Sequence, residues 1–151
     1  MIHNKNILLT IFALSTTGPL FGQDKEVERV NVIVSITNLK TSSGQMRCTM
    51  FRSARGFPRK PELAAHRIIG TIKGKTATCI FQNVVPGSAA ITAFHDENAN
   101  QKLDMTLGVL PKEGLGWSNN PKVTMKPPTF SQAQFQIGTK PTNLGIRLNQ
   151  R

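Results

Sequence analysis

Residues 30–37 are VNVIVSIT, and this stretch decides the fold class. Branched apolar residues occupy every second position, and the positions between them are mostly asparagine, serine and threonine. Alternation with a period of two residues is typical of a β-strand that buries one face. The stretch therefore predicts a half-buried strand at the start of the folded domain.

Several further short segments have strand patterns. They lie at residues 45–52, 68–73, 76–83, 89–94 and 144–148. The first of them is predicted to return on residues 30–37 as a hairpin, and the next two to form a hairpin about Gly74-Lys75. There is no sustained stripe with a period of 3.6 residues. We expect a mainly β protein of about seven strands in two packed antiparallel sheets, a transthyretin- or immunoglobulin-like sandwich, with a small closed barrel as the alternative.

The N-terminus has the pattern of a secretory signal. Lys5 precedes an apolar run at residues 7–14, and small, turn-prone residues follow before the expected cleavage after Gly22. The apolar run is short for a membrane span, and no later segment is apolar enough for one. We expect a signal peptide at 1–22 and one domain at 23–151, exported to the periplasm or beyond. A retained anchor and a buried N-terminal element are the alternatives.

The chain is strongly basic. Its formal net charge is +11, and removal of residues 1–22 takes away Lys5 alone, which leaves +10. Such a charge favours anionic surfaces and polyanions. The cations are scattered singly, however, with only Arg59-Lys60 adjacent, and no basic stripe with interleaved aromatics appears. An anionic envelope component or a protein partner is therefore expected rather than nucleic acid.

Cys48 and Cys79 are the two cysteines of the chain. An even pair in an exported protein is usually a disulfide. Each cysteine lies on the apolar face of its predicted strand, so the two sulfur atoms can meet across a core. The alternative is two reduced thiols that pack as small hydrophobic side chains.

The segment His95–Asp104 has the clearest ligand-like chemistry. Counted from Asp96 as position 1, side-chain oxygens lie at positions 1, 3, 5 and 9, and a backbone carbonyl lies at position 7. This is the spacing of a calcium loop. The candidate ligands are Asp96, Asn98, Asn100, Lys102 (through its carbonyl) and Asp104, with Glu113 as a possible addition. Gln101 replaces the usual glycine at position 6, and Leu107 replaces the usual glutamate at position 12. A turn whose side chains bond their own backbone is the alternative. Calcium is the only cofactor the sequence indicates.

Other polar and aromatic residues near this loop are candidates for ligand binding. They are His95, Trp117, Ser118 and Asn119. Trp117 can stack on a sugar or anchor a partner, or it can pack the long loop onto the domain. His95 beside acids suggests acid–base chemistry, but no nucleophile accompanies it, and Ser118 lacks the glycine of a nucleophile elbow. No catalytic residue is assigned.

Six pieces of the chain resemble the bacterial family of exported proteins called domain of unknown function 2141. They are Gly56–Pro58, Val84–Gly87, Ala93–Asn98, Pro111–Gly114, Gly116–Asn120 and Pro127–Phe130. The resemblance implies an exported β-sandwich and no established activity. The chain departs from the family where Ala99 and Gln101 replace the usual glycines and where Ala89 replaces a tyrosine.

These observations favour a noncatalytic binding or structural protein of the bacterial cell envelope, with a calcium loop at 96–104 as one possibility. An enzyme acting on an envelope glycan is the second hypothesis, with His95, Asp96 and Glu113 as its candidate residues. A basic adhesion module for anionic surfaces is the third.

Overall fold

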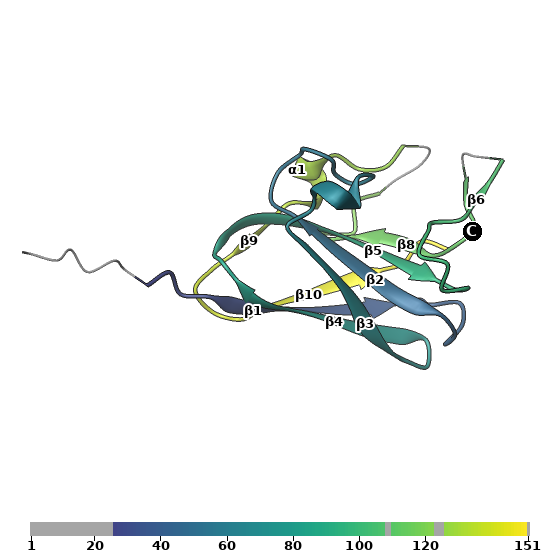
Figure 1. The fold of residues 1–151 in the computed structure, drawn as a ribbon, viewed down its shortest axis with the longest axis horizontal. Coiled ribbons are helices and arrows are strands. Elements are labelled where there is room, and N and C mark those ends of the chain that lie inside the picture. The colour runs from purple at the N-terminus through teal and green to yellow at the C-terminus, as the bar shows by residue number, and fades with distance from the viewer. Residues whose placement is uncertain (1–25, 108–109, 123–125, 151) are drawn as a thin grey trace, which may run out of the picture.

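The computed structural model describes residues 26–107, 110–122 and 126–150, and strands are its main regular structure (Figure 1). The strands are β1 (Val30–Thr37), β2 (Gln45–Phe51), β3 (His66–Lys73), β4 (Thr76–Val84), β5 (Gly87–Asp96), β6 (Met105–Thr106), β7 (Leu110–Pro111), β8 (Leu115–Trp117), β9 (Phe135–Ile137) and β10 (Thr142–Arg147). A short 3-10 helix covers Pro61–Leu63, and α1 covers Phe130–Ala133. The prediction of a mainly β protein is confirmed.

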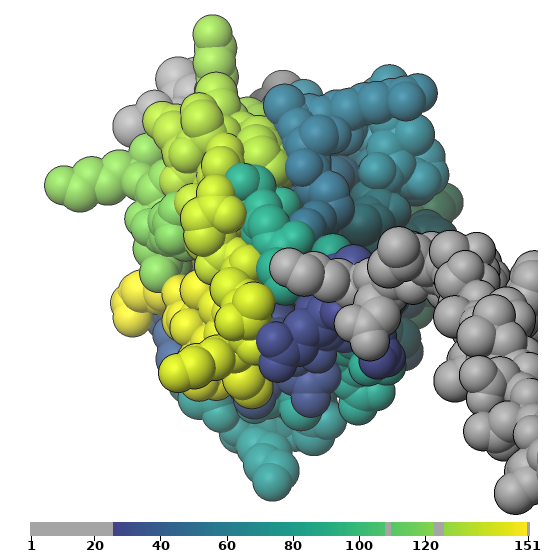
Figure 2. All heavy atoms as spheres, turned by 90° about the vertical axis from the view of Figure 1, so that its left-hand side faces the viewer, coloured from purple at the N-terminus to yellow at the C-terminus, as the bar shows by residue number. Residues whose placement is uncertain are grey.

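One sheet of eight strands forms the body of the molecule. Its order is β10-β1-β4-β3-β2-β5-β8, with β9 added to the other end of β5, and β6 pairs with β7 separately. Only the β1–β10 pair is parallel, and Figure 2 shows the yellow C-terminal region directly beside the purple β1. A bridge between Leu115 and Asn149 joins the two ends of the sheet. The sheet is therefore nearly closed, and the predicted pair of separate sheets is not confirmed; the architecture is nearer to the barrel alternative.

The predicted hairpin between residues 30–37 and 45–52 is wrong. β1 pairs with β4 and β10, whereas β2 pairs with β3 and β5. The link between them carries two left-handed residues, Asn38 and Gly44, and leads the chain across to the end of β5. A Cβ on Gly44 would lie 2.1 Å from the carbonyl oxygen of Asp96, so this close crossing requires glycine.

The hairpin about Gly74-Lys75 is confirmed, but its first strand serves two partners. Residues 71–73 of β3 pair with β4, and the earlier part of β3 pairs with β2. Gly70 stands at the change of partner, where a Cβ would lie 2.6 Å from the sulfur of Cys79. The absence of a side chain there lets β3 pass over the disulfide and bend the sheet round.

The core lies inside this curved sheet. Alternate residues of β1, including Val32, Val34 and Ile36, are fully buried there, as the pattern of residues 30–37 predicts. The disulfide Cys48–Cys79 is present and links β2 to β4 across the interior, closing a sequence separation of 31 residues. Cross-links of this kind restrict the unfolded chain and stabilise a domain by about 2–4 kcal/mol.

The outer face of β2, β5 and β8 is covered by a second layer. Ala90 and Trp117 pack there against Ala133 of α1, with Phe57 and Phe130 beside them. Figure 1 shows α1 and the 3-10 helix on the same side of β5 as β6. Because both faces of β5 are covered, its central residues form the continuous apolar run that predicted a buried strand.

The predicted signal peptide at 1–22 lies outside the described residues. Within the described ranges, no helix has the length and apolar character needed to cross a membrane.

Candidate functional site

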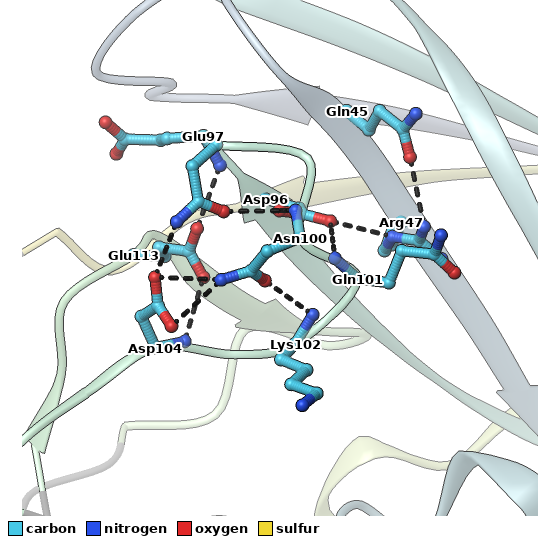
Figure 3. Close-up of polar contacts among 10 residues, drawn as sticks. Gln45, Arg47, Asp96, Glu97, Asn100, Gln101, Lys102, Asp104 and Glu113 are labelled. Atoms are coloured by element: carbon cyan, nitrogen blue, oxygen red, sulfur yellow. Dashed lines mark hydrogen bonds and ion pairs between the residues drawn. The ribbon is translucent and has the colours of Figure 1, made fainter.

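The loop that follows β5 is organised by the buried carboxylate of Asp96 (Figure 3). Its Oδ1 atom accepts the backbone N–H of Asn100 at 3.0 Å, and its Oδ2 atom accepts that of Gln101 at 2.9 Å. The Nε atom of Arg47 on β2 forms an ion pair with Oδ2 at 3.0 Å. Gln101 has a positive φ of 68°, so it adopts the left-handed turn for which glycine was expected at this position.

The middle of the loop is bonded to itself. The Oδ1 atom of Asn98 accepts the N–H of Asn100 at 3.1 Å, and the Oδ1 atom of Asn100 accepts that of Lys102 at 2.8 Å. The side-chain amides of both asparagines donate to the carboxylate of Asp104, the shortest of these contacts being 2.8 Å. The carboxylate of Asp104 is thus solvated by amide groups of its own loop.

Glu113 closes the loop from the far side. Its buried carboxylate accepts the N–H of Glu97 at 2.9 Å and the N–H of Asp104 at 3.0 Å. The structure therefore brings the predicted metal ligands together, with Lys102 contributing its N–H. The described residues contain no group of three or more His, Cys, Asp or Glu side chains that could hold a metal ion. The geometry is that of the self-bonded turn, and calcium binding stays a prediction.

His95 is separated from these acids by the alternation of β5. Its side chain is fully buried on the inner face, where Nε2 donates to the carbonyl of Ser43 at 2.7 Å. Asp96 is the next residue along the strand and faces the opposite side. The strand thus keeps the imidazole and the carboxylates of Asp96 and Glu113 from forming one acid–base group.

The polar residues after Trp117 bind backbone groups. The buried hydroxyl of Ser118 accepts the N–H of Ile91 at 2.9 Å and donates to the carbonyl of Ala133. The side chain of Asn119 donates to the carbonyl of Gln134 at 2.6 Å. These contacts fasten the end of β8 to β5 and to the region of α1, so the two residues are held by the fold itself.

A pocket of about 850 Å³ lies on the outer face of the sheet. Thr49, Thr92 and Trp117 form a row across its floor, because they are register partners on β2, β5 and β8. The walls come from distant parts of the chain. They include Pro58, Arg59, Pro61, Gln101, Lys102, Leu103, Met105, Leu110, Pro111, Lys126, Pro127, Asn149 and Gln150.

Two residues of this floor carry unsatisfied hydrogen-bonding groups. Thr92 is 8% exposed and Trp117 is 5% exposed. Neither the hydroxyl of Thr92 nor the indole N–H of Trp117 has a hydrogen-bond partner among the described residues. Buried polar groups of folded proteins are nearly always paired. Seven described residues have such an unpaired side-chain atom, and Thr92 and Trp117 are the two that are register partners on the floor of this pocket.

The sequence singled out Trp117 but missed Thr92. A threonine in a strand is ordinary, because its branched side chain suits the pleated sheet. Thr92 is nevertheless the one polar residue in the apolar run of residues 89–94. Because that run is buried on both faces, a polar residue within it could have indicated a binding site.

A mainly β, disulfide-linked, nearly closed barrel with a pocket on its outer face is the class of protein that the fold and the site define. Over residues 34–144 the chain matches the family described as an uncharacterized protein conserved in bacteria, domain of unknown function 2141, and it belongs to that family. The resemblance seen in the sequence is thereby confirmed. Searches of curated proteins and of solved structures gave no match. The function has to be argued from the site.

Proposed function

We propose that this protein is an exported, noncatalytic binding protein of the bacterial cell envelope, and that the outer-face pocket is its binding site. One observation carries the proposal: the buried hydroxyl of Thr92 and the buried indole N–H of Trp117 stand side by side at the pocket without partners among the described residues. An unpaired buried polar group costs about 1–3 kcal/mol, and a ligand that accepts both hydrogen bonds would recover that free energy.

The size and lining of the pocket support the same function. Its volume of about 850 Å³ lies within the range of small-molecule sites, roughly 300–1,000 Å³. Phe94, Leu110 and Leu115 are among the ten apolar residues of the lining, and the other nine lining residues are polar or charged. A hollow that combines apolar walls with hydrogen-bonding groups can hold a small molecule in one orientation.

The chemistry of the lining favours binding over catalysis. Glu113 is the one carboxylate among the described lining residues, and its two oxygens already accept backbone N–H groups. No histidine or cysteine lies among those lining residues. A general base has to reach the proton that it removes, and the Glu113 carboxylate is only 5% exposed and is held by two backbone donors.

The disulfide supports export. Disulfides persist in oxidising compartments and are rare in the cytosol, where thiols are kept reduced. The Cys48–Cys79 bridge is buried in the core, as expected of a structural cross-link. It is compatible with a periplasmic or extracellular location.

Trp117 provides a direct test of the binding site. It is the only tryptophan, and the chain contains no tyrosine, so indole fluorescence reports on the pocket alone. We expect the neutral apolar dye N-phenyl-1-naphthylamine to bind with one-to-one stoichiometry. Its own emission should rise as the emission of Trp117 falls by energy transfer.

A matched pair of variants localises that binding. Leu110 is 40% exposed and lines the pocket, whereas Ile80 is 47% exposed and does not. Leu110→Gln should weaken dye binding several-fold, and Ile80→Gln should leave it unchanged. Absence of saturable dye binding, or equal loss in the two variants, would contradict the proposed function.

A further inference from the structure

We infer, on the basis of the proposed binding function, that the ligand of the pocket is an amphiphile with an apolar body and an anionic head group. The inference rests on four properties of the lining: its charge, the hydrogen-bonding groups on its floor, its apolar walls and the burial of its tryptophan. Each of them narrows the class of molecule that can bind.

The exposed charged residues that line the pocket are all positive. Arg59, Lys102 and Lys126 line it, and all three are exposed. Among the described residues the one ion pair is Arg47–Asp96, so these three cations have no carboxylate partner there. The carboxylate of Glu113 is buried and engaged by two N–H groups, so the exposed charges of the lining are the three cations. Such a distribution favours a negatively charged group.

The hydrogen-bonding groups on the floor have the same preference. An indole N–H can only donate, and it therefore requires an acceptor from the ligand. The hydroxyl of Thr92 beside it can donate as well. Carboxylate and phosphate groups are acceptors with several lone pairs, and hydrogen bonds to charged groups are roughly twice as strong as neutral ones.

The rest of the lining requires an apolar body. Phe94, Leu115 and Met105 lie on different segments and face one hollow together with four prolines of the walls. A small inorganic anion would leave this surface unfilled, and burial of apolar surface contributes most of the affinity at such sites.

The burial of Trp117 separates an amphiphile from a sugar. Sugar rings stack on an open aromatic face, but Trp117 is only 5% exposed and is packed beside Phe57, Phe130 and Ala133. The indole therefore has no open ring face on which a sugar can stack. This favours a chain-like apolar ligand over a glycan.

Displacement of the dye tests the inference with ligands that share one ten-carbon chain. Decanoate and decyl phosphate are anionic, decanol is neutral, and decyltrimethylammonium is cationic. Each is used below its micelle-forming concentration. We expect both anions to displace N-phenyl-1-naphthylamine at concentrations roughly tenfold lower than decanol, with the cation weakest, and added salt to reduce the difference. The two anions also distinguish a carboxylate from a phosphate head group.

Charge-neutral variants complete the test. Lys102→Gln combined with Lys126→Gln should weaken decanoate binding by roughly fivefold and leave decanol unchanged. Lys73→Gln combined with Lys75→Gln alters the β3–β4 hairpin, which contributes no lining residue, and should change neither ligand. Equal displacement by all three head-group types would overturn the anionic preference while the dye-binding result upheld the pocket. Failure of the dye itself to bind would instead overturn the proposed function.

Discussion

At the scale of single residues, some polar side chains near Trp117 have hydrogen-bond partners and others have none. Ser118 and Asn119 each bond to backbone groups, so the fold accounts for them. Thr92 and Trp117 are buried, as Ser118 is, yet their polar atoms are unpaired among the described residues. An unpaired buried polar atom lowers the stability of the ligand-free protein, and we assign these two residues to the proposed binding site.

Replacement of Thr92 by valine separates stability from binding. The substitution removes an unsatisfied buried hydroxyl and keeps a branched side chain of similar shape. We expect Thr92→Val to raise the free energy of unfolding by about 1 kcal/mol, measured by urea denaturation. The same variant should bind decanoate about fivefold more weakly, since one hydrogen bond to the ligand is lost.

The matching control for this substitution is Thr78→Val. Thr78 is exposed on β4 and does not line the pocket, so neither stability nor affinity should change much. A fall in the stability of Thr92→Val would mean that the hydroxyl has a partner in the ligand-free protein. Thr92 would then not be an unsatisfied donor at the pocket.

Loss of the Ser118 hydroxyl should have the opposite effect to loss of the Thr92 hydroxyl: it should lower stability and leave binding nearly unchanged. Ser118→Ala leaves the N–H of Ile91 and the carbonyl of Ala133 without their buried partner. We expect a loss of about 2 kcal/mol in the free energy of unfolding, and dye affinity within about twofold of the wild type. Ser35→Ala, on the exposed face of β1, serves as the control. Loss of binding without loss of stability would instead make Ser118 a ligand-binding residue.

At the scale of elements, the loop of residues 96–104 holds its shape through its own side chains. Asp96 is neutralised by Arg47, and Asp104 receives amide donors from Asn98 and Asn100. A calcium ion would have to compete with these contacts for the same oxygens. We therefore expect calcium at millimolar concentration to leave the melting temperature unchanged relative to a chelator, as followed by circular dichroism.

The variant Asp104→Asn tests whether any effect of calcium on the melting temperature comes from this loop. The substitution replaces an acceptor-only side chain and should lower stability by about 1 kcal/mol with or without calcium. If calcium raises the melting temperature of the wild type and not that of the variant, the loop is a calcium site after all. Its affinity would then be that of weak extracellular calcium modules.

The elements also show where sequence reasoning succeeds. Alternation located β1 and β10, and the apolar run located β5, because side-chain burial leaves a local pattern. The pairing of distant strands leaves no local pattern in the sequence. β1 and β10 are parallel neighbours in the sheet, although most of the domain lies between them in the sequence. The candidate loop was found from its spacing alone. The pocket was not found, because its walls come from segments between Pro58 and Gln150 that only the fold brings together.

At the scale of the whole molecule, closure of the sheet and formation of the pocket are linked. The two edge strands of the sheet, β8 and β10, are joined where Leu115 and Asn149 exchange backbone hydrogen bonds of 3.2 and 2.9 Å. Leu115 and Asn149 both line the pocket, as does the next residue, Gln150. Gln150 also donates from its side chain to the carbonyl of Asn38 after β1. Asn149 and Gln150 therefore complete the barrel and one wall of the site together.

A proline at position 149 should open this junction and weaken binding at the same time. Proline lacks the N–H that Asn149 donates to the carbonyl of Leu115, whereas alanine keeps it. We expect Asn149→Pro to lose about 1–3 kcal/mol more stability than Asn149→Ala in urea denaturation. The amide of Leu115 should exchange faster with solvent, and dye affinity should fall in the proline variant alone. Equal exchange and equal affinity in the two variants would show that the barrel and its pocket do not depend on this closure.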